Sequence, residues 1–291
     1  MPAPAPITSK SNARVKALRA SFSGKPSQPG DLLGLEGEHL IAEALRSGLT
    51  LETLFLREGS VAQPGAPHPA SEMWVSNEPS PSRNAHDTLI LSRDVFASAV
   101  ETASPQGIAA TVLIPTVAPP SPQSHSIALV LESLQDPGNL GTLIRSAEAF
   151  GANQIYLTPD TVNPWNPKVV RASAGSVFRV PITRAPLAQI AAQLRQRGTT
   201  LYAADAHPSN SVSLLQTTFA SLTAILIGNE GAGLSSEALA LADHRIRIPC
   251  AVESLNAAIA GSTLLFEALR QRVASNPQLY PPSSIPCPLP L

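Results

Sequence analysis

Cysteine is scarce in this chain of 291 residues, which contains only Cys250 and Cys287. Two cysteines are too few for a framework of disulfide bonds or for a zinc site. The six histidines are scattered, and none recurs at a spacing typical of metal ligands. We therefore expect no metal, and we interpret Cys250 as a small packing residue.

Charged residues are also few. Lys, Arg, Asp and Glu make up 14% of the chain, and the formal net charge at pH 7 is −1. Proteins that bind nucleic acids usually carry a basic surface, so this balance argues mildly against that class. Basic residues nevertheless cluster locally, at Lys10, Arg14, Lys16, Arg19 and Lys25 and again at Lys168, Arg171 and Arg179. Each cluster is either a nucleic-acid contact or a solvated face.

Two kinds of apolar segment are missing. No apolar run reaches the roughly 20 residues that a helix needs to cross a bilayer. The first ten residues, MPAPAPITSK, lack the apolar core of a secretion signal. A cytoplasmic protein with no membrane partner is the simplest expectation.

Proline divides the chain, which contains 29 prolines. Residues 115–126 (PTVAPPSPQSHS) have the composition of a stiff linker, and residues 276–291 form a proline-rich tail that we expect to be loose. Residues 1–114 alternate between short helical and strand patterns, which predicts a small α/β domain. The expected helices cover 11–22, 36–46 and 93–101, and the expected strands cover 51–56, 73–76 and 109–114.

Residues 127–275 alternate between buried strands and amphipathic helices. This alternation predicts a doubly wound parallel sheet with helices on both faces. The expected strands cover 127–132, 154–157, 200–204, 222–227 and 246–249, and the expected helices cover 140–150, 167–173, 186–197, 235–242 and 254–272.

Three strands of this second domain end in polar turns. The first turn, ESLQDPGNLG, carries Asn139, and Arg145 follows six residues later. The second, GNEGAGL, carries Glu230 among glycines, and the third, IPCAVESLN, ends on Ser254 and Asn256. Because parallel strands end at one edge of a sheet, we expect the three turns to form one shared site. A Ser or Asn in front of a helix is equally typical of an N-cap.

Two common nucleotide-binding signatures are absent from these turns. The glycine-rich turn at 228–234 lacks the Gly-Lys-Ser/Thr ending of a triphosphate-binding loop. The turn PGNLG at 137–141 does not provide the G-x-G-x-x-G of a dinucleotide-binding fold. An unrelated nucleotide-binding enzyme with a Rossmann-like sheet is therefore disfavoured.

The three turns together resemble the three motifs of the SpoU (TrmH-like) family of RNA ribose methyltransferases, in the SPOUT class. The matching residues are Asn139, Gly141, Arg145 and Gly151, then Gly228, Asn229, Glu230, Gly231 and Gly233, then Ile248, Pro249, Glu253, Ser254, Leu255, Asn256 and Ala257. The resemblance implies a deep trefoil knot in the C-terminal domain, S-adenosylmethionine as cofactor and a homodimer. It also implies transfer of a methyl group to a ribose 2′-hydroxyl of RNA.

The first domain is similar to the ribosomal-protein-like substrate-binding domain of many members of the family. The similarity rests on ITSKSNARVKAL, GLEGEHLIAEAL and LETLFLR, although Leu33-Gly34-Leu35 replaces the usual Phe-Leu. This domain favours ribosomal RNA as the substrate, with transfer RNA as the alternative. A third possibility is an RNA-binding member of the same fold without catalytic activity.

The resemblance also implies roles for single residues. The implied catalytic residues are Arg145, Asn139, Glu230, Ser254 and Asn256, and the implied cofactor-binding residues are Ala203, Leu226, Gly228, Ile248, Leu255 and Ala257. We expect Lys168, Arg171, Arg14 and Lys16 to contact RNA. A guanidinium is a poor base because it binds its proton tightly, so we assign Arg145 to orienting the RNA phosphate. The structural alternatives are core packing for the apolar residues, helix capping for Ser254 and Asn256, and a solvated face or salt bridge for the basic ones.

Overall fold

The computed structural model describes residues 5–23, 25–60, 85–102, 104–118, 120–121, 124–207 and 211–276. The chain forms two compact units. The first contains Met1–Val117 and Asn163–Arg179, and the second contains Ala118–Val162 and Val180–Leu291. The expected continuous domain over 127–275 is therefore interrupted, because Asn163–Arg179 groups with the first unit. The expected strand at 73–76 and residues 277–291 of the expected tail lie outside the described residues.

The first unit has a four-stranded sheet in the order β1-β4-β2-β3. Strands β1, β4 and β2 pair antiparallel, while β2 and β3 pair parallel. The elements are α1 (Ala13–Ser23), β1 (Leu32–Glu36), α2 (Glu38–Arg46), β2 (Leu51–Arg57), β3 (Thr88–Leu91), α4 (Arg93–Ala99) and β4 (Ile108–Leu113). Two of its strands, β1 and β3, were not predicted. Strand β1 contains Gly34, and a glycine weakens the sequence pattern of a strand. A Cβ at this position would lie only 2.6 Å from Ser21 Oγ, so Gly34 allows α1 to pack closely on the strand.

The core of the first unit lies between its sheet and two helices. Helix α1 contributes Val15, Leu18 and Phe22, which recur at three- and four-residue steps and are buried. These side chains pack with Phe96 of α4 and Phe55 of β2. Of the basic residues on α1, Arg14 and Lys16 are exposed, whereas Arg19 donates to the carbonyl of Ser98 at 3.1 Å.

The segment Asn163–Arg179 completes the first unit from a distant part of the sequence. It holds α6 (Pro167–Ala172) and a single turn, η1 (Ser176–Phe178). Asn163 Nδ2 donates to the carbonyl of Pro26 at 2.7 Å, and Arg179 Nη1 donates to Ser47 Oγ at 2.8 Å. At Gly175, whose φ is +86°, a Cβ would lie 2.5 Å from the Cβ of Glu43, so only glycine fits there.

The second unit is built on a seven-stranded sheet in the order β7-β6-β5-β10-β8-β11-β9. All its strand pairs are parallel, which confirms the parallel sheet predicted from the sequence. The strands are β5 (Ser126–Leu131), β6 (Gln154–Leu157), β7 (Ile182–Arg184), β8 (Thr200–Ala204), β9 (Val212–Ser213), β10 (Leu222–Ile227) and β11 (His244–Arg247). The short edge strands β7 and β9 were not predicted, because two or three residues show no periodicity.

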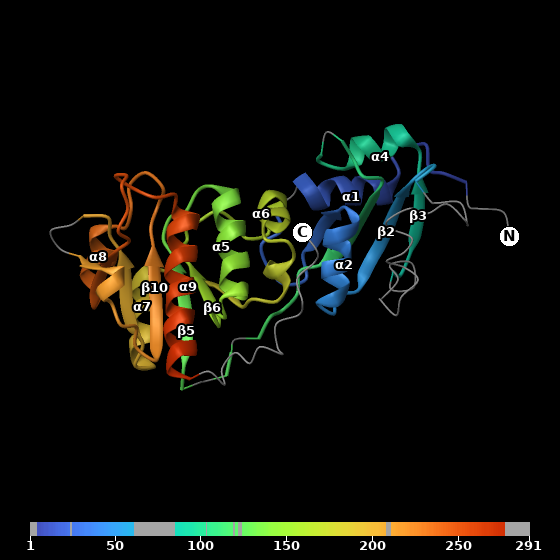
Figure 1. Ribbon diagram of the computed structural model, residues 1–291. Helices are drawn as coiled ribbons and strands as arrows, with labels where there is room; N and C mark the ends of the chain where they lie inside the picture. The colour runs from blue at the N-terminus through green and yellow to red at the C-terminus, as the bar shows by residue number, and fades with distance from the viewer. Residues whose placement is uncertain are drawn as a thin grey trace. The chain divides into compact units, whose positions relative to one another are not determined.

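Helices cover both faces of this sheet, as a doubly wound fold requires (Figure 1). Helices α7 (Leu187–Gln196) and α8 (Ser236–Leu241) pack on one face, against a core that includes Val130 and Leu226. Helices α5 (Pro137–Ala149) and α9 (Ala257–Ser275) lie side by side on the other face. At Gly261 of α9 a Cβ would lie 2.4 Å from Leu143 of α5, so this glycine permits their close contact. The trefoil knot stays a prediction.

Candidate active site

Strands β5, β8, β10 and β11 run parallel, so their carboxyl ends meet at one edge of the sheet. The three polar turns lie at this edge. We call them the first-motif loop (residues 133–136), the second-motif loop (residues 228–234) and the third-motif loop (residues 248–256). The first leads into α5 and the third into α9.

Hydrogen bonds join side chains from all three motifs. Asn139, in the first turn of α5, donates through Nδ2 to Glu230 Oε1 at 3.0 Å. Asn256 donates through Nδ2 to Asn139 Oδ1 at 2.9 Å. The nitrogen and the oxygen of the Asn139 amide therefore have different partners, and this fixes the orientation of the amide. The structure brings together three of the five residues to which catalysis was assigned.

The Glu230 carboxylate also binds the backbone of the first-motif loop. It accepts hydrogen bonds from the N–H groups of Asp136 at 3.2 Å and Gln135 at 3.4 Å. Burial acts to raise the pKa of Glu230, but the hydrogen bonds from Asn139 and from backbone N–H groups outweigh it. The pKa of Glu230 therefore lies below its ordinary value, and the group is a carboxylate at neutral pH.

Two of the site residues also cap helices. Asp136 accepts from the N–H of Asn139 at the start of α5, at 2.7 Å. Asn256 Oδ1 accepts from the N–H groups of Ala258 and Ile259 at the start of α9. The capping interpretation of Asn256 is confirmed, and the same side chain uses its Nδ2 in the site. The capping alternative for Ser254 is wrong, because its exposed hydroxyl makes no hydrogen bond within the described part of the chain.

The second-motif loop is a closed turn that only glycine permits. At the buried Gly228 a Cβ would lie 2.2 Å from the carbonyl carbon of Gly233 and 2.4 Å from the nitrogen of Leu234. The backbones of Asn229 and Gly233 exchange two hydrogen bonds, of 3.0 and 2.9 Å. Asn229 Oδ1 accepts from Gly231 N at 2.9 Å, so hydrogen bonds within the loop hold its shape.

The residues to which cofactor binding was assigned all lie at or next to this edge. Ala203 of β8 and Leu226 of β10 are fully buried neighbours in the sheet. Ile248 follows β11, Leu255 precedes α9 and Ala257 begins it. Small and apolar residues beside a glycine loop leave the backbone accessible to a ligand. This arrangement fits an adenosine-containing cofactor that is recognised through main-chain groups.

Arg145 lies on the exposed surface of α5. Among the described residues it has no hydrogen bond and no ion pair, and it does not join the network of Asn139, Glu230 and Asn256. An exposed guanidinium without a partner keeps all five of its N–H donors for a ligand. Arg145 is therefore free to bind a phosphate.

The four residues assigned to RNA binding all belong to the first unit. Arg14 and Lys16 are exposed on α1. Arg14 Nη2 lies 3.5 Å from Asp87 Oδ2, which is an ion pair between exposed groups. Lys168 is exposed on α6. Arg171 forms an ion pair of 3.0 Å with Glu101, so the salt-bridge alternative describes this residue. It lies in Asn163–Arg179 and not in the unit that carries the motifs.

Two residues that were not assigned a role hold the loops together. Asn229 donates through Nδ2 to the carbonyl of Ser133 at 2.8 Å. Gln135 donates through Nε2 to the carbonyls of Ser133 and Asp160, at 3.2 and 2.6 Å. The sequence carries a signal for Asn229, which belongs to the second motif. It carries none for Gln135, whose contact with Asp160 is seen only in the structure.

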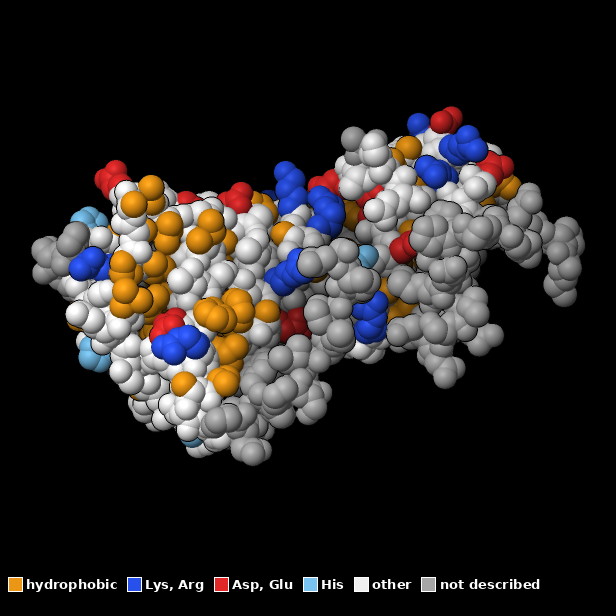
Figure 2. All heavy atoms as spheres, viewed as in Figure 1, with side chains coloured by type: hydrophobic (Ala, Val, Ile, Leu, Met, Phe, Trp, Pro, Cys, Tyr) orange, Lys and Arg blue, Asp and Glu red, His pale blue; other side chains and the backbone are white. Residues whose placement is uncertain are grey.

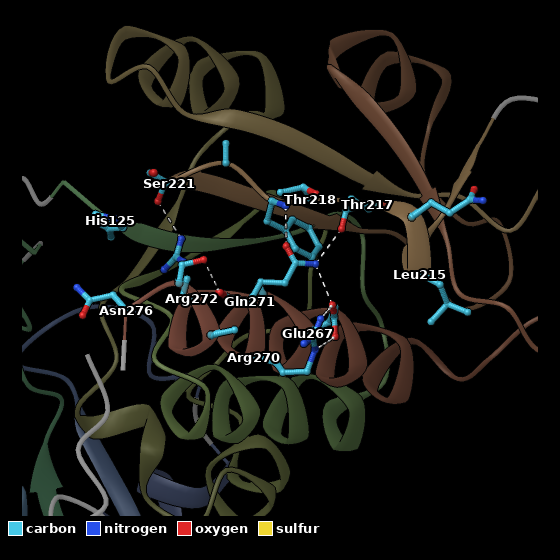
Figure 3. Close-up of a pocket in the computed structure, with 16 residues that line it drawn as sticks. His125, Leu215, Thr217, Thr218, Ser221, Glu267, Arg270, Gln271, Arg272 and Asn276 are labelled. Carbon is cyan, nitrogen blue, oxygen red and sulfur yellow. Dashed lines mark hydrogen bonds and ion pairs between the residues drawn. The ribbon is translucent and has the colours of Figure 1, made fainter. Parts of the chain in front are cut away.

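A pocket of about 680 Å³ lies at the opposite edge of the sheet (Figure 3). It is lined by residues that precede β5 and β10 and by the last turns of α9. Gln271 donates to the carbonyl of Thr217 and accepts from Phe219 N, and Arg272 donates to the carbonyls of Ser126 and Ser221. These side chains fasten α9 to the amino ends of the strands. The pocket is thus separate from the three motifs.

Within the described ranges, no group of three or more His, Cys, Asp and Glu residues is arranged to hold a metal ion. In the same part of the chain, no helix has the length and apolar character that crossing a membrane requires.

Comparisons with known proteins agree on one family. The family model of the SpoU rRNA methylases matches residues 126–266. An uncharacterized tRNA/rRNA methyltransferase of Synechocystis is 37% identical over 94% of this chain and 96% of its own. RlmP of Bacillus subtilis, a 23S rRNA (guanosine(2553)-2′-O)-methyltransferase, is 30% identical over 89% of this chain and 97% of its own. An AdoMet-bound rRNA methyltransferase from Sinorhizobium meliloti shares the fold with a TM-score of 0.72 and 30% identity, over 91% of this chain and 97% of that one. The chain therefore belongs to the SpoU family, and it is an RNA 2′-O-ribose methyltransferase that uses S-adenosylmethionine.

Proposed function

We propose that this enzyme methylates ribosomal RNA, and that Asn139, Glu230, Asn256 and Arg145 serve the transfer. The observation that carries the proposal is the hydrogen-bonded chain from Glu230 through Asn139 to Asn256 at the carboxyl edge of the sheet. It joins one polar residue of each motif, beside the residues that we propose to bind the cofactor. The names of the relatives support ribosomal RNA, and transfer RNA is the alternative.

Positioning is the main task of these residues. S-adenosylmethionine, when bound, supplies a methyl group that its sulfonium already activates. The second- and third-motif loops would bind it through their backbone, while the fixed amides of Asn139 and Asn256 would orient the ribose. Ser254, exposed two residues before Asn256, would line the same place.

Arg145 has a different role from the amides. A guanidinium is a positively charged donor, so Arg145 would bind the RNA phosphate and stabilise negative charge that develops on the ribose oxygen. Its exposure on α5 and its lack of a partner among the described residues support this role.

The first unit would supply general RNA binding. Lys16 and Arg14 are exposed on the outer face of α1, and Lys168 is exposed on α6. Contacts of this kind are made with the phosphate backbone and are weakened by salt. The ion pair with Glu101 makes Arg171 the least available of the four basic residues.

The enzyme would act as a homodimer in the cytoplasm. Ile259 and Phe266, seven residues apart on α9, are 57% and 51% exposed. Phe266 packs edge to face with Phe150 at the end of α5, with ring centroids 5.7 Å apart. Figure 2 shows hydrophobic side chains gathered over this face of the second unit. A second copy would cover them, and light scattering of wild type and of Phe266→Glu tests this: the variant should be monomeric.

Two measurements test the function. Calorimetric titration with S-adenosylmethionine should show binding. Incubation with tritiated cofactor should then label ribosomal RNA from cells that lack the gene, and mapping should place the label on one ribose. Label in transfer RNA instead would favour the alternative substrate. A folded protein that does not bind the cofactor would be an RNA-binding member of the fold without activity.

A further inference from the structure

Arg184, the last residue of β7, binds a series of backbone carbonyls. Its Nη1 donates to the carbonyls of Thr158, Pro159 and Thr161 at 3.1, 2.7 and 2.7 Å, and its Nη2 donates to that of Val162 at 3.1 Å. We call residues 158–162, which follow β6, the β6 loop. The remaining carbonyl of this loop, that of Asp160, accepts from Gln135 Nε2 at 2.6 Å. Every carbonyl of the β6 loop is therefore held by a side chain.

The β6 loop in turn holds the first-motif loop. Thr158 Oγ1 accepts from the N–H of Ser133 at 2.9 Å, and the N–H of Val162 donates to the carbonyl of Leu134 at 2.8 Å. Together with the bond from Gln135 to Asp160, these contacts reach three successive residues of the segment that leads into α5. The conformation of the first-motif loop therefore depends on hydrogen bonds to the β6 loop.

Ser133 makes this support necessary. Its φ is +53°, a left-handed conformation that a residue other than glycine adopts only when its surroundings impose it. The surroundings do so from both sides, because Thr158 accepts its N–H and Asn229 donates to its carbonyl. Three residues after Ser133, the N–H of Asp136 donates to Glu230. A relaxed Ser133 would shift the backbone that binds Glu230 and carries Asn139.

We propose that Arg184 is a positioning residue for methyl transfer. It does not contact Asn139 or Glu230; it fixes the β6 loop, which fixes the first-motif loop and through it both side chains. The inference rests on the proposed role of these two residues in the transfer. An arginine suits the task because its planar fork places several donors at once, which the single ammonium of a lysine cannot do.

The test compares three full-length proteins: wild type, Arg184→Met and Arg197→Met. Arg197 is an exposed arginine at the end of α7 in the same unit, and it serves as the matched control. Each protein is assayed with tritiated S-adenosylmethionine and total RNA from cells that lack the gene, and cofactor affinity is measured by calorimetry. Arg184→Met should lower kcat about 10- to 100-fold and change the cofactor Kd by less than about threefold, because misplacement of reacting groups affects turnover. Arg197→Met should change neither.

A second substitution separates positioning from general stability. Ser133→Gly makes the left-handed conformation easy, so it should restore part of the kcat lost in Arg184→Met. A purely structural role would not give this recovery. A folded Arg184→Met with wild-type kcat overturns the proposal, and so does a loss that Ser133→Gly leaves unchanged.

Two further outcomes are decisive. If Arg184→Met does not fold, Thr158→Val replaces it. This substitution exchanges for a methyl group the hydroxyl that accepts from Ser133 and that also bonds Thr161 Oγ1 at 3.2 Å. A wild-type kcat in Thr158→Val would then overturn the proposal, and a lowered kcat with normal cofactor affinity would support it. If the wild type labels no RNA, the proposed function fails and the inference fails with it.

Discussion

Asn139 donates a hydrogen bond of 3.0 Å to Glu230, a residue 91 positions further along the chain. This bond fixes which end of the Asn139 amide faces which partner, because the oxygen must then accept from Asn256. A carboxylate in the second motif thereby sets the orientation of amides in the first and third.

Replacing Asn139 with Asp should damage the enzyme more than replacing it with Ala. The new carboxylate would face Glu230 where a donor now lies, and like charges at this distance repel. We expect methyl transfer to fall by at least about 100-fold in both variants, as expected when a preorganised donor is lost. Thermal unfolding should show a further loss of about 1 kcal/mol in Asn139→Asp alone. Equal melting temperatures for the two variants would contradict the prediction.

Acid should weaken the fold through Glu230. Its folded-state pKa lies below its ordinary value of 4.5, so its contribution to stability is fully present above that value and is lost as the pH falls through the folded-state pKa. Melting temperatures of the wild type should therefore drop more steeply below about pH 4.5 than those of Glu230→Gln. Parallel curves for the two proteins would show that the carboxylate is not stabilised in this way.

Two glycines of the second-motif loop offer a matched pair. Gly228→Ala places a Cβ 2.2 Å from the backbone of Gly233, so the loop must open and cofactor affinity should fall by at least about tenfold, about 1.4 kcal/mol. Gly231→Ala meets only Asn229 Oδ1, at 3.6 Å, which is ordinary contact. Calorimetry with S-adenosylmethionine should thus separate the two substitutions. Unchanged affinity in both variants would mean that the loop does not contact the cofactor.

Arg145→Ala should abolish methyl transfer while leaving cofactor affinity nearly unchanged. The reason is that Arg145 is exposed on α5 and takes no part in the loops at the cofactor edge. We expect a loss of about 100-fold or more in turnover, with a change in the calorimetric Kd of less than about threefold. Arg145→Lys keeps the positive charge but lacks the planar guanidinium. Its turnover should lie between those of the wild type and Arg145→Ala. Loss of cofactor binding in Arg145→Ala would contradict the role proposed for Arg145.

Lys16 should contribute to RNA affinity through charge alone. Lys16→Ala should weaken binding to any RNA of similar length and lower the slope of log affinity against log salt by about 1. Lys16→Arg keeps the charge and should retain that slope. Filter binding over a range of salt concentrations measures both. An unchanged slope in Lys16→Ala would remove α1 from the RNA-binding surface.

Periodicity was sufficient for the long elements and not for the short ones. The apolar spacing of α5 and α9 and the buried runs of β5 and β10 predicted these elements and their parallel arrangement. Strands β7 and β9 have three and two residues, and so short a run shows no pattern that separates it from a loop. Strand β3 has four residues and was missed, although β6, of the same length, was predicted. Strand β1 was obscured by Gly34, which is explained only by the helix that packs on it.

The site could be predicted as a group but not as a network. Three turns at the ends of parallel strands must share an edge, and this logic placed Asn139, Glu230 and Asn256 together. Which donor meets which acceptor depends on distances between loops far apart in sequence. The same limit hid Arg184, whose partners lie 22 to 26 residues earlier. It also hid the grouping of Asn163–Arg179 with the first unit.

That grouping has a consequence for the order in which the protein matures on the ribosome. When residues 1–117 have emerged, the first unit still lacks Val169 and Phe178, which are buried, and the bond from Asn163 to Pro26. The segment that completes it is synthesised only after β5 and β6 of the second unit. The first unit begins the sequence, but its chain is complete only at Arg179, after part of the second unit has been made.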